Sequence, residues 1–255
     1  MKHIRIIEAF VQTEEWLEVL QQVCQRYARE DLTLSVGFPD SGPELEAHES
    51  LTALNLAVPE LIKNAIQAEK EGVDGIMIDC MADPGVEVLR ESVSIPVLGP
   101  GHASMYAAAM LGRRFSLLVT TEFSARYFLE HVHRAGLGSR LASCQAIGIP
   151  PEEIGADSVR SVELLVEAAT EAIVKARADT LILGCTGFVS HAEVLREKLN
   201  AMNLSVPLID PFAVTINMLV ALTNAGLTQS RVAYPDTGIG KSIGTHGIPG
   251  VKASG

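Results

Sequence analysis

Basic residues are scarce in this chain. Its 255 residues include 20 lysines and arginines against 31 aspartates and glutamates, so the formal net charge is −11. Proteins that bind nucleic acid use lysine and arginine side chains to neutralise phosphates, and they carry those side chains in clusters. The sequence has no such basic block, so we expect no nucleic-acid partner.

Long hydrophobic runs are missing as well. Apolar runs such as Ile76-Met77-Ile78 and Leu181-Ile182-Leu183 are short, whereas a membrane helix needs about 20 apolar residues. The N-terminal residues alternate as in a strand and reach Glu8 before a signal-peptide core of about seven apolar residues can form. We therefore expect no membrane partner and a cytoplasmic location.

Cysteine is rare, with four residues and no Cys-x-x-Cys pair. Such a pair would suggest a zinc site or a redox motif, and neither is favoured here. In a reducing compartment we expect Cys24, Cys80, Cys144 and Cys185 to be thiols. The sequence predicts no metal site.

An internal repeat organises the rest of the chain. The composition, 47% hydrophobic and 20% charged, is typical of a globular protein with one large domain or two domains of about 100 to 130 residues. Segment 73–81 matches segment 178–186 position by position. In each segment an aspartate opens a short apolar run, and a cysteine, Cys80 or Cys185, closes it. The repeat favours two domains.

Each half of the chain reads strand, helix, strand, helix, strand, helix, strand. The apolar runs are too short for helices and are typical of buried strands in a parallel sheet with helices on both faces. The other strands of the two halves are expected at 3–7, 32–36 and 94–100, and at 114–119, 141–147 and 205–211. The predicted fold class is therefore α/β, with two pseudo-symmetric open parallel sheets flanked by helices.

The domain boundaries follow from the repeat. We expect residues 1–98 with about 211–255 to form the first domain, and residues 99–210 to form the second. The glycine-rich residues 231–255 predict an arm that packs on the body or on a neighbouring subunit, and we expect a homo-oligomer. The Gly-Lys-Ser sequence in this arm is not a phosphate loop, because Pro235 stands where the first glycine is required.

Cys80 and Cys185 are the candidate catalytic residues. Ligands of open parallel sheets bind at the carboxyl ends of the strands, where both cysteines lie. If the two halves face each other across a cleft, the two thiols reach a bound molecule from opposite sides, and the active site lies in that cleft. This is the arrangement needed to remove a proton from one face of a carbon and to deliver one to the other.

The remaining parts of such a site can also be named. The main-chain N–H groups of Met81, Ala82, Thr186 and Gly187 would stabilise the developing enolate, and no metal or cofactor is required. Buried cysteines are more often small apolar packing residues than catalysts, and we assign that structural role to Cys24 and Cys144.

Several motifs identify a family. Gly184-Cys185-Thr186-Gly187, Cys80 followed by Asp83-Pro84-Gly85, Gly112-Arg113-Arg114-Phe115-Ser116 and Thr120-Thr121 resemble the aspartate/glutamate/hydantoin racemase superfamily. The resemblance covers about residues 1–230 and is closest to the hydantoin and allantoin racemase branch. It implies two pseudo-symmetric Rossmann-like domains and cofactor-independent racemisation with one cysteine from each half.

By position, the resemblance makes Cys80 and Cys185 the acid/base pair. The residues expected to bind a small-molecule substrate are Glu8, Phe10, Met81, Ala82, Thr120, Thr121, Thr186, Gly187 and Phe188. Glu8-Ala9-Phe10 replaces the Asn-Pro-Asn usual in the hydantoin branch. An anion at Glu8 would repel a carboxylate and accept hydrogen bonds from an amide, ureido or ammonium group, which favours a hydantoin, ureide or amino-acid derivative over glutamate.

Two alternatives to a racemase or epimerase remain open at this point. One is a cysteine-dependent cis-trans isomerase or decarboxylase of the same superfamily. The other is a protein that binds a small molecule without catalysis, because two α/β lobes around a cleft also describe solute receptors.

Overall fold

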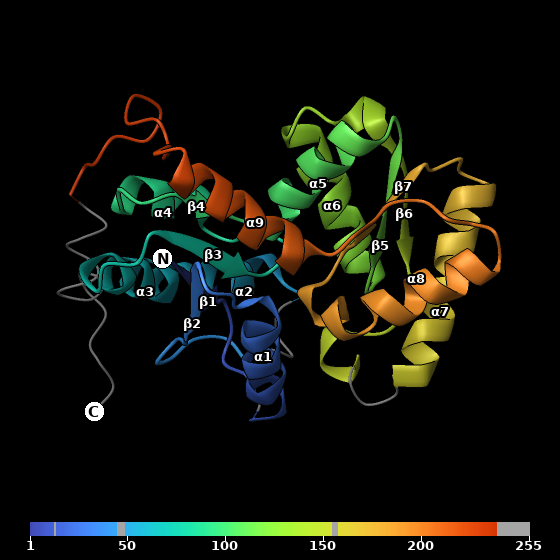
Figure 1. Cartoon of the computed structure of the whole chain (residues 1–255), viewed down its shortest axis with the longest axis horizontal. Helices are drawn as coiled ribbons and strands as arrows, with labels where there is room; N and C mark the ends of the chain where they lie inside the picture. The colour runs from blue at the N-terminus through green and yellow to red at the C-terminus, as the bar shows by residue number, and fades with distance from the viewer. Residues whose placement is uncertain (13, 45–48, 155–157, 239–255) are drawn as a thin grey trace. The chain divides into compact units, whose positions relative to one another are not determined.

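The computed structural model describes residues 1–12, 14–44, 49–154 and 158–238 (Figure 1). Its strands form two four-stranded sheets in which every neighbouring pair is parallel. The Gly-Lys-Ser sequence and most of the predicted arm lie outside the described residues. No helix within the described ranges has both the length and the apolar character needed to cross a membrane.

The first sheet has the strand order β2-β1-β3-β4. Its central strands are β1 (Lys2–Glu8) and β3 (Gly75–Asp79), and β2 (Leu32–Gly37) and β4 (Val97–Leu98) lie at the edges. All five residues of β3 are buried, as expected for a strand covered on both faces. The helices connecting these strands are α1 (Glu14–Tyr27), α2 (Leu51–Leu56), α3 (Val58–Lys70) and α4 (Val86–Ser92).

The second sheet repeats this order as β6-β5-β7-β8. Its strands are β5 (Phe115–Val119), β6 (Leu141–Ala146), β7 (Thr180–Leu183) and β8 (Leu208–Ile209). Its helices are α5 (Pro100–Leu111), α6 (Glu122–Arg134), α7 (Ser158–Val174) and α8 (Ala192–Ala201), with short 3₁₀ helices η2 (Gly138–Arg140), η3 (Pro151–Glu153) and η4 (Thr186–Ser190). The α/β class and the repeated parallel sheet are confirmed.

The last strand of each sheet is shorter than predicted. Strands were expected over 94–100 and 205–211, but β4 and β8 pair over only two residues each. Each begins directly after a proline, Pro96 or Pro207. Proline has no N–H to donate to the ladder, so regular pairing starts only after it.

Equivalent aspartates join the strands of each sheet. The carboxylate of Asp74 accepts hydrogen bonds from the main-chain N–H of His3 at 2.8 Å and from Lys2 Nζ at 3.2 Å. The carboxylate of Asp179 accepts from the N–H groups of Arg113 and Arg114 at 2.9 and 3.0 Å. The two halves therefore repeat this interaction as well as the sequence. In each half an aspartate just before the third strand accepts hydrogen bonds from the start of the first strand.

Internal contacts divide the chain into two compact units. The first contains residues 1–79, 83–99 and those from 216 onward, and the second contains 80–82 and 100–215. Helix α9 (Pro211–Asn224) contributes to both. Segment 80–82 groups with the second unit although it directly follows β3 of the first. Cys80 and Cys185, which come from different halves of the sequence repeat, thus belong to the same unit by contact.

The described part of the C-terminal segment packs on the first unit. The side-chain amide of Gln229 donates to the carbonyls of Val93 and Ile95 at 2.8 and 3.0 Å. The guanidinium of Arg90 lies 5.5 Å from the centre of the Tyr234 ring. These contacts tie the segment to the region between α4 and β4.

Candidate active site

Cys80 follows the last residue of β3 and opens a tight turn into α4. Asp83 has φ = 52° and Gly85, which caps the helix, has φ = 68°. A Cβ atom on Gly99 would lie only 2.2 Å from Oδ1 of Asp83, so a residue without a side chain is required there. Glycine at position 99 therefore leaves room for the carboxylate of Asp83.

Cys185 lies at the equivalent place after β7. Gly184 precedes it, and a Cβ atom on Gly184 would lie 2.5 Å from Cγ1 of Val119 and 2.8 Å from the carbonyl oxygen of Leu118. The backbone of β5 and the end of β7 therefore approach too closely for any side chain. Cys185 is extended, with φ = −144° and ψ = 137°, and it leads into η4.

The other two cysteines lie in regular elements. Cys24 is on α1 and Cys144 is on β6. Burial, with a smaller contribution from the charge of Asp79, raises the pKa of the Cys24 thiol. Burial, followed by the charge of Glu122, raises the pKa of Cys144 to about 12. Both thiols stay protonated near neutral pH, which suits the structural role assigned to them.

Glu8 ends β1 and is almost completely buried, with 1% of its surface exposed. Burial first, and then the charge of Asp79 and a hydrogen bond with it, raise the pKa of Glu8 well above its ordinary value. Its Oε2 atom accepts a hydrogen bond from Nε2 of Gln12 at 2.7 Å. The expectation of a simple anion at Glu8 therefore needs correction, because this carboxyl group keeps its proton to higher pH than an exposed one.

Three further residues predicted to bind substrate lie close to these strand ends. The side chains of Phe10 and Met81 are buried, with 3% and 4% exposed. The carbonyl of Ala82 accepts a hydrogen bond from the phenol of Tyr127 at 2.9 Å. This bond ties the residues after Cys80 to α6 within the second unit.

The two threonines after β5 have structural partners. The hydroxyls of Thr120 and Ser124 lie 2.9 Å apart, and the carbonyl of Thr120 accepts a hydrogen bond from the N–H of Gly148 at 2.8 Å. Thr121 caps α6, and its hydroxyl accepts from the N–H of Ser124 at 3.5 Å. These bonds fix the loop at the carboxyl edge of the second sheet.

The residues after Cys185 differ in what they can offer a ligand. Thr186 and Gly187 open η4, where main-chain N–H groups have no partner within the helix. A Cβ atom on Gly187 would lie 3.4 Å from Sγ of Cys185. The Phe188 side chain is fully buried in a core cluster with Leu118 and Leu165. Any substrate contact by Phe188 would therefore use its main chain.

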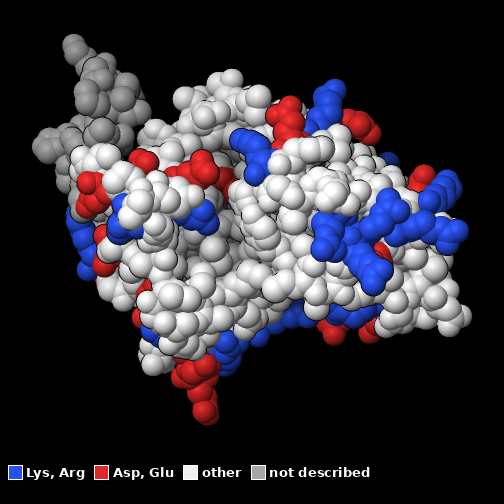
Figure 2. Space-filling model, turned by 90° about the horizontal axis from the view of Figure 1, so that it is seen from above, with Lys and Arg blue, Asp and Glu red and all other residues white. Residues whose placement is uncertain are grey.

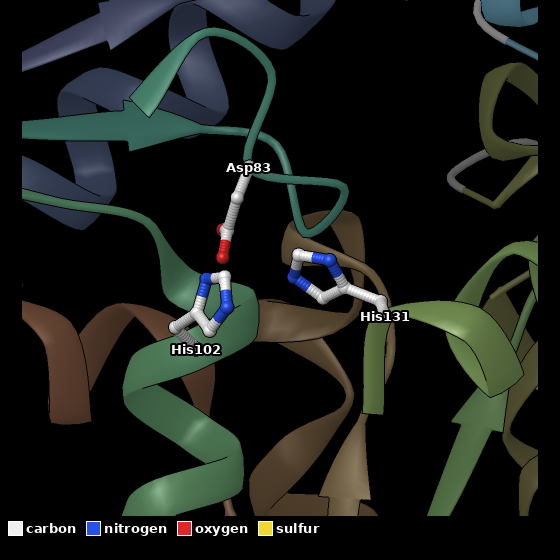
Figure 3. A group of neighbouring side chains, drawn as sticks. All are labelled: Asp83, His102 and His131. Carbon is white, nitrogen blue, oxygen red and sulfur yellow. The ribbon is translucent and has the colours of Figure 1, made fainter. Parts of the chain in front are cut away.

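The second unit also contains two neighbouring histidines, half-buried His102 and buried His131, that the sequence did not single out as a group. The rings of His102 and His131 lie with their centres 4.4 Å apart, and Figure 3 shows them beside each other. Their ring nitrogens lie within 4.8 Å of one another, so both could bind one metal ion.

His191 is separate from this pair. It lies at the start of α8 with its ring buried, and burial lowers the pKa of the imidazole. Its Nδ1 atom lies 3.0 Å from the hydroxyl of Ser190. Its neutral ring packs edge-on against Phe188.

Charged side chains are distributed in small groups over the face drawn in Figure 2. Several basic side chains lie together toward the right of this view, and basic and acidic side chains touch one another in several places.

An open parallel sheet used twice, with a cysteine after the third strand of each copy, defines an α/β protein of the doubly wound class. In proteins of this class ligands bind at the carboxyl ends of the strands. Residues 13–219 match the Asp/Glu/Hydantoin racemase family. The chain belongs to this family and is an isomerase of the racemase class.

Individual relatives agree with this assignment. The hydantoin racemase of Pseudomonas sp. (strain NS671) is 26% identical over 220 residues, which cover 85% of this chain and 86% of that protein. The hydantoin racemase of Rhizobium meliloti is 31% identical over 183 residues, or 71% and 74% of the two chains. The structure of allantoin racemase from Pseudomonas fluorescens has a TM-score of 0.82 at 22% identity and covers 99% of both chains, which shows a shared fold. The resemblance to the hydantoin and allantoin branch is confirmed.

Proposed function

We propose that this protein is a cofactor-independent racemase or epimerase in which Cys80 and Cys185 form the acid/base pair. The observation that carries the proposal is the matched position of the two thiols, each within two residues of the end of the third strand of a repeated sheet. Cys24 and Cys144 have no such counterpart and have raised pKa values. Both copies of the repeated unit carry a thiol at the carboxyl edge of the sheet, and this supports a shared chemical role for the two cysteines.

The reaction needs only proton transfers. One cysteine, as thiolate, removes the proton from the stereocentre and becomes a neutral thiol, and the electron pair of the broken C–H bond moves into the adjacent carbonyl. The other cysteine, initially a thiol, donates its proton to the opposite face of the planar carbon and becomes a thiolate. The product has inverted configuration, and the protonation states of the two cysteines are exchanged.

Main-chain N–H groups stabilise the enolate in this proposal. We assign this role to Met81 and Ala82 after Cys80, and to Thr186 and Gly187 after Cys185. N–H donors placed where negative charge develops lower the barrier because they need no reorganisation during the reaction. With two thiols and these donors, no electron-accepting cofactor is needed for the proton transfer.

We propose a substrate with a stereocentre between a carbonyl group and a nitrogen, such as a hydantoin, a ureide or an amino-acid derivative. Two of the relatives that match the sequence are hydantoin racemases. The carboxyl groups of Glu8 and Asp79 at the end of the first sheet disfavour a substrate carboxylate at that position, whereas ureido N–H groups can donate to them. Thr120, Thr121 and Phe10 complete the proposed substrate site.

Two further expectations accompany the proposed function. Both catalytic cysteines must stay reduced, which fits the reducing cytoplasm expected from the sequence. We also retain the expectation of a homo-oligomer, which size-exclusion chromatography with light scattering measures directly.

Proton exchange in deuterated water tests the function. Single enantiomers of a 5-substituted hydantoin and of allantoin are incubated with enzyme, and proton NMR and chiral chromatography follow the stereocentre. We expect loss of the C–H signal together with inversion, and loss of inversion in both Cys80→Ser and Cys185→Ser. Cys144→Ser is the matched control and should remain active.

Other outcomes separate the alternatives. Full activity in either Cys80→Ser or Cys185→Ser would contradict the two-thiol mechanism. Release of carbon dioxide from a substituted malonate, or isomerisation of maleate, in place of proton exchange would assign the site to a decarboxylase or a cis-trans isomerase. Saturable binding without exchange would indicate a non-catalytic binding protein.

A further inference from the structure

Two carboxyl groups meet at the carboxyl edge of the first sheet. Strands β1 and β3 are parallel neighbours, and their last residues, Glu8 and Asp79, are partners in the register. Paired residues on neighbouring strands place their side chains on the same face of the sheet. Asp79 is followed directly by Cys80, so this pair ends where the proposed catalytic segment begins.

Both carboxyl groups are shielded from water. Glu8 is 1% exposed and Asp79 is 5% exposed. The neutral amide of Gln12 donates a hydrogen bond to the Oε2 atom of Glu8. Burial, and then the charge of Asp79, raise the pKa of the Cys24 thiol on α1.

Two full negative charges are unfavourable in such a place. Burial penalises each ionised carboxylate, and two like charges on neighbouring strands repel each other in a medium that screens poorly. One proton held between the two groups removes the second charge and supplies a hydrogen bond between them.

We propose that Glu8 and Asp79 form a positioning pair that holds one proton between its two carboxyl groups and keeps a single negative charge beside Cys80. The pair orders the ends of β1 and β3 through the shared hydrogen bond. It also limits the negative charge next to the thiol, so that Cys80 can still ionise. This second role rests on the proposed function, whereas the proton count does not.

The proposal predicts that each single variant keeps the same net charge on the pair as the wild type. In Glu8→Gln the amide takes the place of the protonated carboxyl group and donates to ionised Asp79, so one negative charge remains. In Asp79→Asn the charge moves to Glu8 and again remains one. Only the double variant removes it.

The test is alkylation by iodoacetamide at pH 7, quantified for each cysteine by peptide mass spectrometry. We expect each single variant to label Cys24 and Cys80 within about twofold of the wild type. In the double variant, loss of the neighbouring charge lowers the thiol pKa values, and labelling should accelerate about threefold or more. Cys144, on a strand of the other sheet, is the internal control and should not change.

Three results would overturn the pair. If Glu8→Gln or Asp79→Asn alone accelerates labelling as much as the double variant, the charge belongs to that one residue. If each single variant accelerates labelling part of the way, the wild type carries two charges. If the double variant labels like the wild type, no charge is held near these thiols. Neither readout depends on turnover, so failure of the pair is distinguishable from failure of the racemase proposal.

Infrared spectroscopy gives a measurement that needs no double variant. The wild-type protein at pH 7 should show the carbonyl stretch of one buried protonated carboxylic acid, shifted in deuterated water. The band should be absent from both Glu8→Gln and Asp79→Asn, because the remaining carboxyl group is then ionised. Absence of the band from the wild type would contradict the proposal.

Discussion

The Cβ position of Gly187 lies 3.4 Å from the Sγ atom of Cys185 and 3.2 Å from Cδ1 of Ile154. The first contact is ordinary van der Waals packing, and the second involves the end of a flexible side chain. An added methyl group can therefore fit into the fold, but it occupies space directly beside the sulfur.

We expect Gly187→Ala to reduce racemisation far more than it reduces stability. The methyl group would crowd the carbon that must approach the Cys185 sulfur, and an error of about 1 Å in a reacting pair can cost about 100-fold in rate. The free energy of unfolding should change by no more than about 1 kcal/mol. Kinetics and urea unfolding on the same samples measure both quantities, and wild-type kcat/KM in Gly187→Ala would show that this space is unimportant.

Gly184→Ala should behave in the opposite way. Its Cβ atom would lie 2.5 Å from Val119 Cγ1 and 2.8 Å from a main-chain oxygen that cannot move aside cheaply. Overpacking of this kind typically costs about 1 to 3 kcal/mol. Urea unfolding should show this loss, and an unchanged midpoint would mean that β5 and β7 separate more easily than the packing indicates.

Cys144 should be the slowest thiol to react in the native protein. Burial and the charge of Glu122 raise its pKa to about 12, so very little thiolate is present at pH 8. Iodoacetamide labelling followed by peptide mass spectrometry should show Cys144 protected in the native state and labelled at the rate of the other cysteines in urea. Rapid native labelling of Cys144 would contradict its structural role.

Glu8 should make stability depend on pH. Its pKa is raised in the folded state, first by burial and then by Asp79, so the folded protein binds a proton that the unfolded chain releases above its ordinary pKa of 4.5. The stabilisation from this proton is present in full below that value and is lost as the pH rises above it, by at most about 1.4 kcal/mol per pH unit. Urea unfolding between pH 5 and 8 measures this slope.

The Glu8→Gln variant is the control for that slope. Glutamine keeps the size and hydrogen bonding of the protonated side chain and cannot ionise. As the pH rises, the free energy of unfolding of the wild type should therefore fall relative to that of the variant. Parallel pH profiles for the two proteins would show that Glu8 has an ordinary pKa.

Local sequence pattern was sufficient to predict the repeated sheets. Strands β3 and β7 are short apolar runs buried on both faces, and such runs are recognisable without knowledge of their neighbours. The position of each cysteine follows from the strand that precedes it. Strands β4 and β8 are shorter than the apolar pattern predicts, because regular pairing starts only after Pro96 and Pro207.

Other features depend on contacts between distant residues. The partnership of Glu8 with Asp79 requires the register of two strands, and no spacing along the chain reveals it. One feature of the sequence does point to Asp79: the repeat aligns it with Gly184. The third strand therefore ends in a carboxylate in the first half and in a residue without a side chain in the second. The burial of Phe188 was missed because it depends on how η4 packs into the core.

The separation of the Cys80 and Cys185 sulfur atoms around a bound substrate analogue tests the central claim most directly. Each sulfur must come within about 3 to 3.5 Å of the reacting carbon from opposite faces, so a crystal structure of the complex should show the sulfurs about 6 to 9 Å apart with the stereocentre between them. Sulfurs more than about 12 Å apart in the closed complex, or both on one face of the ligand, would contradict proton transfer by two thiols.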